Sequence, residues 1–95
     1  MNAVEFVKKF GWEESQHISS LIMETGENIY GVEREDLHRL VESYELVMEF
    51  GDNETYLKNY LTKNPKVKGF YLDSWCQTFT RERLNQAIAD VEKCQ

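Results

Sequence analysis

The chain has 95 residues, of which 41% are hydrophobic, 13% aromatic and 29% charged. Hydrophobic residues at this frequency can build the core of one small domain spanning residues 1–95, and they exclude a disordered chain. No apolar run is longer than three residues, which excludes a membrane-spanning helix.

The formal net charge of −6 at pH 7 comes from the first half of the chain. Residues 1–50 hold 11 acidic side chains against 4 basic ones, whereas residues 51–95 hold 6 against 7. An acidic half disfavours nucleic acid and attracts basic protein surfaces. The alternative is a solvated acidic face that only keeps the protein soluble.

Two short helices are predicted before residue 26. Asn2 can cap the first one, and Gly11 supplies a left-handed stop at its end. The second helix covers residues 13–24 and ends at Thr25-Gly26. Residues 27–32 follow as a connection with some β character.

The clearest pattern predicts a helix from about Glu33 to Phe50, closed by Gly51. Its main apolar stripe keeps helical spacing: Leu37, Leu40, Val41, Tyr44, Val47 and Met48. Leu46 and Phe50 lie off that stripe. Either the helix is buried on more than one side, which is the commoner case in a small helical domain, or these two residues form an exposed apolar patch for a partner.

The rest of the chain is predicted to hold two more helices around an aromatic segment. Asp52 or Asn53 caps the first of them, and Asn64-Pro65 ends it because the residue before a proline avoids helical geometry. The last helix begins at Thr80, whose side chain can cap it.

Residues 66–78 are dense in aromatic side chains without a clear period, which is typical of a short strand or an ordered loop. A minor two-stranded element would pair residues 67–72 with residues 28–32. The predicted fold class is therefore mainly α, with about five short helices in one small domain, and the alternative class is α+β.

The sequence holds no motif that points to catalysis, so we predict that the protein is not an enzyme and needs no cofactor. A metal site is not expected either. A zinc site would have to combine Cys76 and Cys94 with His17 and His38, which lie in four separated segments. We predict two free thiols, with Cys76 buried beside Trp75 and Cys94 in a frayed C-terminus.

The candidate protein-binding residues lie on the long helix. Glu42, Glu45 and Glu49 recur every three or four residues and line one edge, with Leu46 and Phe50 as apolar anchors beside them. This pattern predicts a non-enzymatic module that binds another protein through an acidic helical face. An alternative is a self-associating protein, such as a homodimer, in which Leu46 and Phe50 are the contacts.

A second candidate surface spans residues 58–83. Its basic residues are Lys58, Lys63, Lys66, Lys68, Arg81 and Arg83, and they alternate with Tyr60, Phe70, Tyr71, Trp75 and Phe79. Such a mixture suits a single-stranded nucleic acid or a nucleoprotein. Nucleic acid is nevertheless the less favoured partner, because Asp73 and the negative net charge weaken the field. In the favoured interpretation these aromatic residues complete the core and the lysines solvate a loop.

Three stretches of the sequence carry a resemblance to known proteins: AVEFVKKFGW (Ala3–Trp12), LHRLVESYELV (Leu37–Val47) and LNQAIADVE (Leu84–Glu92). They resemble small accessory proteins encoded in the early regions of lambda-like phages and enterobacterial prophages. The resemblance leaves out residues 52–80 and carries no site chemistry. It implies a phage or prophage product made in the bacterial cytoplasm, of a kind that often binds and modifies a host protein.

Overall fold

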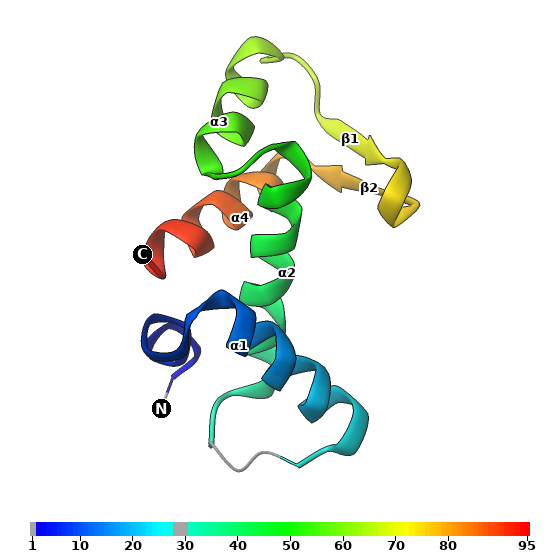
Figure 1. Ribbon diagram of the computed structural model, residues 1–95. Coiled ribbons are helices and arrows are strands. Elements are labelled where there is room, and N and C mark those ends of the chain that lie inside the picture. Colours follow the sequence, from blue (N-terminus) through cyan, green and yellow to red (C-terminus); the bar gives the residue numbers. More distant parts are fainter. Residues whose placement is uncertain (1, 28–30) are drawn as a thin grey trace.

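The computed structural model describes residues 2–27 and 31–95, which form four α-helices and one antiparallel hairpin (Figure 1). The elements, in chain order, are α1 (Ala3–Thr25), α2 (Arg34–Phe50), α3 (Glu54–Lys63), β1 (Gly69–Leu72), the 3-10 turn η1 (Asp73–Trp75), β2 (Gln77–Thr80) and α4 (Arg81–Lys93). The predicted class, mainly α with a minor two-stranded element, is confirmed. None of the described helices is long and apolar enough to cross a membrane.

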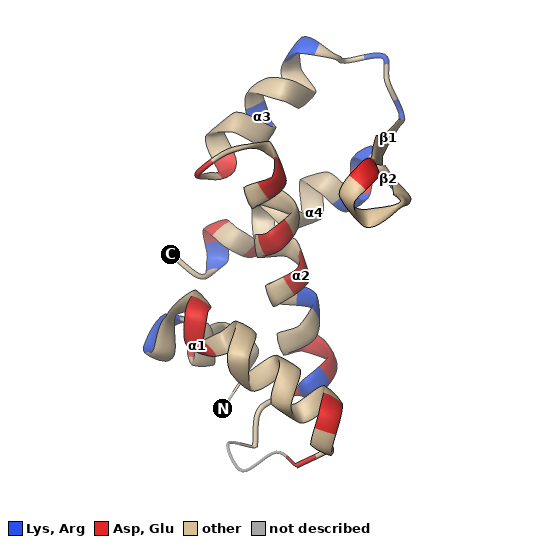
Figure 2. Cartoon of the chain, turned by 45° about the vertical axis from the view of Figure 1, so that its right-hand side comes forward, with Lys and Arg blue, Asp and Glu red and all other residues tan. Residues whose placement is uncertain are grey.

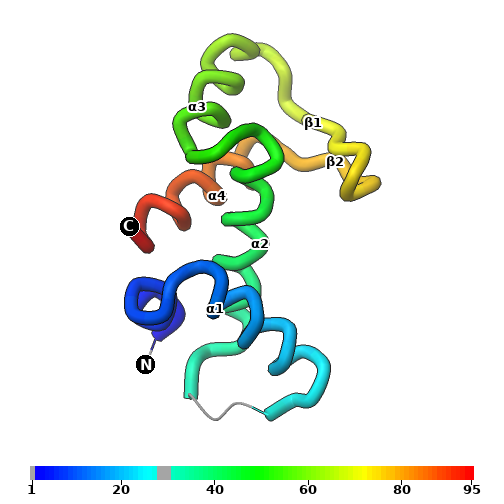
Figure 3. Tube along the Cα trace, in the orientation of Figure 1, coloured from blue at the N-terminus to red at the C-terminus, as the bar shows by residue number. Residues whose placement is uncertain are grey.

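Gly11 divides α1 into two helical arms, as the sequence predicts. Its φ of 84° and ψ of 170° are not helical, and a residue with a side chain rarely adopts them. The tube in Figure 3 changes direction within α1 accordingly. Asn2 caps the first arm by accepting a hydrogen bond of 2.8 Å from the Glu5 N–H, and Gly26 ends the second arm in the left-handed conformation.

Helix α2 is buried on more than one side and packs against α1, α3 and α4. Leu46 is 0% exposed, because it lies in a core cluster with residues of α3 and α4. The expectation that Leu46 is an exposed anchor or a dimer contact is therefore wrong. Phe50 is partly buried against the same cluster, with its ring centroid 5.2 Å from that of Tyr60.

The aromatic segment folds into a hairpin of neighbouring strands. Register pairs run from Gly69 opposite Thr80 to Leu72 opposite Gln77. The expected pairing of 67–72 with 28–32 is wrong for β1, since its partner is β2; residues 28–30 lie outside the described part of the chain. A strand a few residues away costs less loop-closure entropy than one forty residues away.

The remaining helix caps follow the sequence closely. The Asn53 side chain accepts a hydrogen bond of 2.9 Å from the Thr55 N–H at the start of α3, and Thr80 accepts one of 3.1 Å from the Arg83 N–H at the start of α4. Gly51 lies between α2 and α3, and the Tyr56 ring lies against it where a Cβ would collide. That close approach explains why residue 51 is a glycine.

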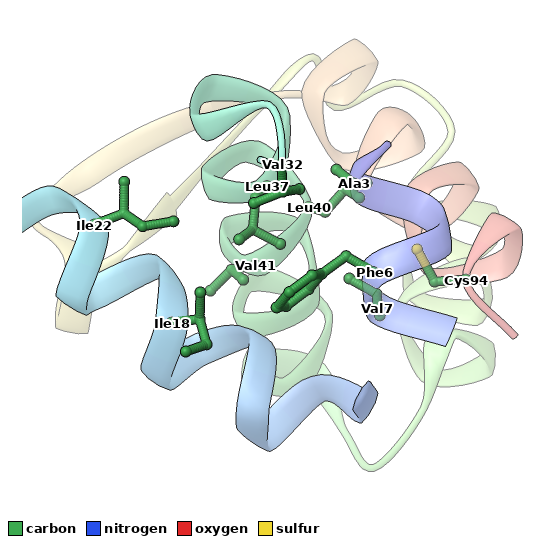
Figure 4. Packing of buried hydrophobic residues seen from close by; sticks show 10 residues of the cluster. All are labelled: Ala3, Phe6, Val7, Ile18, Ile22, Val32, Leu37, Leu40, Val41 and Cys94. Atoms are coloured by element: carbon green, nitrogen blue, oxygen red, sulfur yellow. The ribbon is translucent and has the colours of Figure 1, made fainter. Parts of the chain in front are cut away.

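The buried hydrophobic residues form two clusters along the length of the molecule. The N-terminal core, shown in Figure 4, combines α1, the start of α2 and the C-terminal end: Ala3, Phe6, Val7, Ile18, Ile22, Val32, Leu37, Leu40, Val41 and Cys94. The hairpin core combines the end of α2 with α3, the hairpin and α4: Leu46, Val47, Leu57, Leu61, Phe70, Phe79, Leu84, Ala87, Ile88 and Val91. Trp12 packs against both clusters and stacks on Tyr44 at 4.5 Å.

Candidate functional site

A cleft of about 420 Å³ opens between the second arm of α1, helix α2 and the tip of the hairpin. Its lining residues come from three separate parts of the chain: Ser19, Ser20, Met23 and Glu24 from α1, His38, Val41, Glu42 and Glu45 from α2, and Trp75 from η1. The two helices contribute most of this lining, and the hairpin tip contributes Trp75. We call this feature the acidic cleft.

The charge of the acidic cleft is negative. Glu24, Glu42 and Glu45 line it, whereas none of its described lining residues is Lys or Arg. Figure 2 shows the same imbalance, with acidic residues along α1 and α2 and most basic residues toward α3 and the hairpin. Three carboxylates in a partly enclosed space favour a cationic group there.

The carboxylates of the cleft differ in their partners. Glu42 faces the Arg83 guanidinium at 3.6 Å and the His38 imidazole at 3.8 Å. Glu45 accepts a hydrogen bond of 3.4 Å from the Gln16 side chain, and no described lysine or arginine lies within ion-pair distance of it. Glu24 forms no ion pair with a described lysine or arginine either, so Glu24 and Glu45 are the carboxylates that could meet a cation from outside.

Glu49, one turn beyond Glu45 on α2, fixes the position of Trp75, which lines the cleft. One of its carboxylate oxygens accepts a hydrogen bond of 3.2 Å from the Trp75 indole N–H, and the other accepts one of 3.1 Å from the Ser74 hydroxyl. The Trp75 ring also meets Phe79 edge to face, with centroids 5.4 Å apart. These contacts fix a half-buried indole in the lining of the cleft.

The structure brings together only part of the predicted acidic site. Glu42 and Glu45 line the cleft and Glu49 supports it, but Leu46 belongs to the hairpin core and Phe50 packs against that core. The apolar surface beside the carboxylates comes instead from Met23, Val41 and Trp75. Met23 lies off the face of the second arm that buries Ile18 and Ile22, and 53% of it is exposed in the structure.

The second predicted surface, residues 58–83, is kept only in part by the fold. Phe70 and Phe79 are 5% and 3% exposed, so the interpretation that aromatic residues complete the core is confirmed for these two. Lys58 pairs with Glu92 at 2.6 Å, and Arg83 pairs with Glu42. Arg81 donates to backbone carbonyls, and only Lys63, Lys66 and Lys68 stay exposed without a described ion-pair partner.

Both cysteines are free thiols, but their burial is the reverse of the expectation. Cys76 is exposed in the tight turn between the strands, where its φ is 48°. Cys94 is buried in the N-terminal core, and burial raises the pKa of its thiol. The end of α4 docks on α1, which orders a residue that a terminal position would leave frayed. No group of three or more described His, Cys, Asp or Glu residues could hold a metal ion.

Comparison with known proteins finds no family model, no curated protein and no solved structure that matches this chain. Its function therefore has to be inferred from the residues and shape of the acidic cleft.

Proposed function

We propose that this protein is a non-enzymatic binding module whose acidic cleft takes a basic segment of another protein, a host or phage protein in the bacterial cytoplasm. The observation that carries the proposal is the lining of the cleft. Three carboxylates line it together with the apolar side chains of Met23, Val41 and Trp75, and no Lys or Arg is among its described lining residues. The resemblance to early-region phage proteins supports the choice of cellular context.

The chemistry of the lining favours a lysine or arginine side chain with apolar neighbours. The cationic end would meet Glu24 and Glu45, and the aliphatic stem would lie on Met23. The Trp75 ring, held by Glu49, offers a face for cation–π contact. A rigid aromatic residue with few free torsions loses little entropy on binding, which is a property of many interface anchors.

The size of the cleft limits what can enter it. Ligand sites range from roughly 300 to 1,000 Å³, and about 420 Å³ accommodates a few side chains of an extended segment. A contact restricted to the cleft buries less than a standard protein interface, so we expect a weak and salt-sensitive complex.

The proposal can be tested by NMR titration with a set of short synthetic peptides of matched length. The set contains peptides with Lys or Arg beside Leu or Phe, their acidic counterparts and neutral ones. We expect only basic peptides to shift the Trp75 indole and Met23 methyl resonances, with shifts that vanish at high salt. Shifts spread over the whole surface, or none at the cleft, would contradict the proposal.

A matched pair of variants sharpens the test. Glu24→Gln combined with Glu45→Gln should weaken the peptide complex about fivefold, because each partly solvated ion pair contributes on the order of 0.5 kcal/mol. Glu13→Gln combined with Glu14→Gln removes the same charge from exposed positions of α1 outside this cleft. Equal losses in both variants would mean that net charge, and not the cleft, attracts the peptide.

A further inference from the structure

The connection between α3 and β1 carries an exposed basic surface. Lys63 ends α3, and Lys66 and Lys68 follow within five residues. All three side chains are exposed, and no described acidic residue forms an ion pair with any of them. Figure 2 shows these basic positions at the α3 end of the molecule, away from the acidic residues of α1.

Arg81 holds this connection in one conformation. Its guanidinium donates hydrogen bonds of 3.2 Å to the Leu61 carbonyl and 2.7 Å to the Val67 carbonyl, and a further one to the Asn64 carbonyl. Its backbone N–H donates to the Lys68 carbonyl at 3.0 Å. A lysine-rich loop that is fixed before binding loses less conformational entropy when it meets a ligand.

An exposed aromatic ring lies on the same stretch of chain. Tyr60 precedes Lys63 by three residues on α3, so the two side chains share a helix face. The Tyr60 ring is held by Phe50 and Phe70, with centroids 5.2 Å and 5.4 Å away, yet 42% of the residue remains exposed. A ring fixed in this way offers a flat surface on which another aromatic group can stack.

We propose that these four residues, Tyr60, Lys63, Lys66 and Lys68, form a basic loop patch that binds single-stranded nucleic acid. The lysines contact backbone phosphates, and Tyr60 stacks on one base. A basic surface that tracks the backbone beside an exposed aromatic ring is the arrangement used for single strands. In a duplex the bases are stacked on each other, so their faces are closed to Tyr60.

The local charge supports this ligand although the whole chain is acidic. Residues 58–83 contain six Lys and Arg against two Asp and Glu. Glu82 is the one carboxylate among the described residues that line a cleft of about 610 Å³ with Lys66, Lys68 and Arg81. The patch shares no residue with the acidic cleft, and its function does not depend on the one proposed there.

The experiment uses the full chain and a fluorescein-labelled oligothymidylate, with binding followed by fluorescence anisotropy at low salt. We expect saturable binding whose affinity falls steeply with salt. The triple variant Lys63→Gln, Lys66→Gln, Lys68→Gln should bind at least about tenfold more weakly, and the slope of log affinity against log salt should fall by about 2, since each phosphate contact on a single strand contributes about 0.7.

A control triple variant removes the same charge elsewhere. Lys8→Gln, Lys9→Gln and Lys93→Gln alter three exposed lysines outside the patch and should leave the affinity within about twofold of the original protein. Thermal unfolding of each variant confirms that it folds. Absence of binding at low salt, or equal losses in the two triple variants, overturns the proposal.

A second pair of variants tests the stacking. Tyr60→Leu keeps apolar contact with Phe50 and Phe70 but removes the aromatic face, and should weaken binding about fivefold or more. Tyr71→Leu is the control, because Tyr71 points to the opposite face of β1 from Phe70. Equal effects of the two substitutions, equally tight binding of duplex DNA, or equal displacement by polyglutamate would overturn the assignment to single strands.

Discussion

The N-terminal core and the hairpin core are built in different ways. The N-terminal core is mostly aliphatic and comes largely from the two arms of α1 and the start of α2, which are neighbours in the sequence. The hairpin core collects four separate elements, with Phe70 and Phe79 inside and Tyr44, Phe50 and Trp75 around it. Among the described residues, polar contacts between distant segments accompany the second core far more than the first.

The clearest of these contacts is a buried polar network between α2 and α4. Asp90 is 0% exposed, and its two carboxylate oxygens accept hydrogen bonds of 2.7 Å from the Ser43 hydroxyl and 2.8 Å from the Gln86 side chain. The Arg39 guanidinium lies 3.4 Å from the same carboxylate. Arg83 donates to Ser43 at 3.1 Å and so connects this network to Glu42 at the acidic cleft.

The difference between the two cores bears on the acidic cleft. The second arm of α1 and α2 contribute most of the lining of the acidic cleft, and the hairpin tip adds Trp75. The position of Trp75 depends on Glu49 and on Phe79, both in or beside the hairpin core. Substitutions in the hairpin core should therefore affect the cleft more than equally destabilising ones in the N-terminal core.

The largest expected effect tests the burial of Leu46. Leu46→Ala leaves a cavity in the hairpin core and should lower the free energy of unfolding by about 3 kcal/mol. Leu40→Ala, equally buried in the N-terminal core, should cost a similar amount. Urea unfolding measures both free energies of unfolding. A decrease below about 0.5 kcal/mol for Leu46→Ala would indicate that Leu46 lies on the surface after all.

A somewhat smaller effect is expected from the polar network. Asp90→Ala leaves the Ser43 hydroxyl buried without its acceptor and should cost about 2 kcal/mol in the free energy of unfolding. Asp90→Asn retains an acceptor and should cost less. Trp75 fluorescence reports on the cleft in both variants. Equal stability of Asp90→Ala and the original protein would show that the network contributes nothing net.

Gly11→Ala should cost about 1.5 kcal/mol in the free energy of unfolding. Apart from its neighbours in the chain and the nearby helix backbone, nothing described lies within 4 Å of the added Cβ, so the cost comes from the backbone conformation. The Trp12 ring, which stacks on Tyr44, should also change its fluorescence. If Gly11→Ala instead stabilises the protein, α1 prefers to be one straight helix. The control is Ser20→Ala, which lies in the middle of the second arm of the same helix.

The smallest effect is a pH dependence. Burial raises the pKa of the Cys94 thiol, whereas in the unfolded chain it ionises near its ordinary value of about 8.5. The stability linked to this thiol is fully present below that value and is lost as pH rises through the higher pKa of the folded state.

We therefore expect a shallower decline of Tm above pH about 8.5 in Cys94→Ala than in the original protein. We compare the slope of Tm against pH and not Tm itself, because Cys94→Ala also removes buried volume and so changes Tm at every pH. Cys76→Ala is the matched control, since its side chain is exposed. The same slope of Tm against pH in all three proteins would contradict a link between the Cys94 thiol and stability.

Local features of the sequence predicted the helices well. The predicted helix from Glu33 to Phe50 differs by one residue from α2, and the break at Gly11 and the caps at Asn53 and Thr80 are present in the structure. The reason is physical: capping, left-handed glycines and helical spacing act over three or four residues. The carboxylate edge of Glu42 and Glu45 was also visible, because it is a property of one helix.

Contacts between distant segments left no such signal. The sequence by itself determined most of the helix boundaries and that the protein is mainly α. Only the tertiary structure decided that Leu46 is covered, that β1 pairs with β2, that Glu49 holds Trp75 and that Cys94 is buried. Each of these features depends on which distant segments pack together. The hydrophobic effect stabilises any well-packed apolar contact, so the local sequence pattern does not specify which segment becomes the partner.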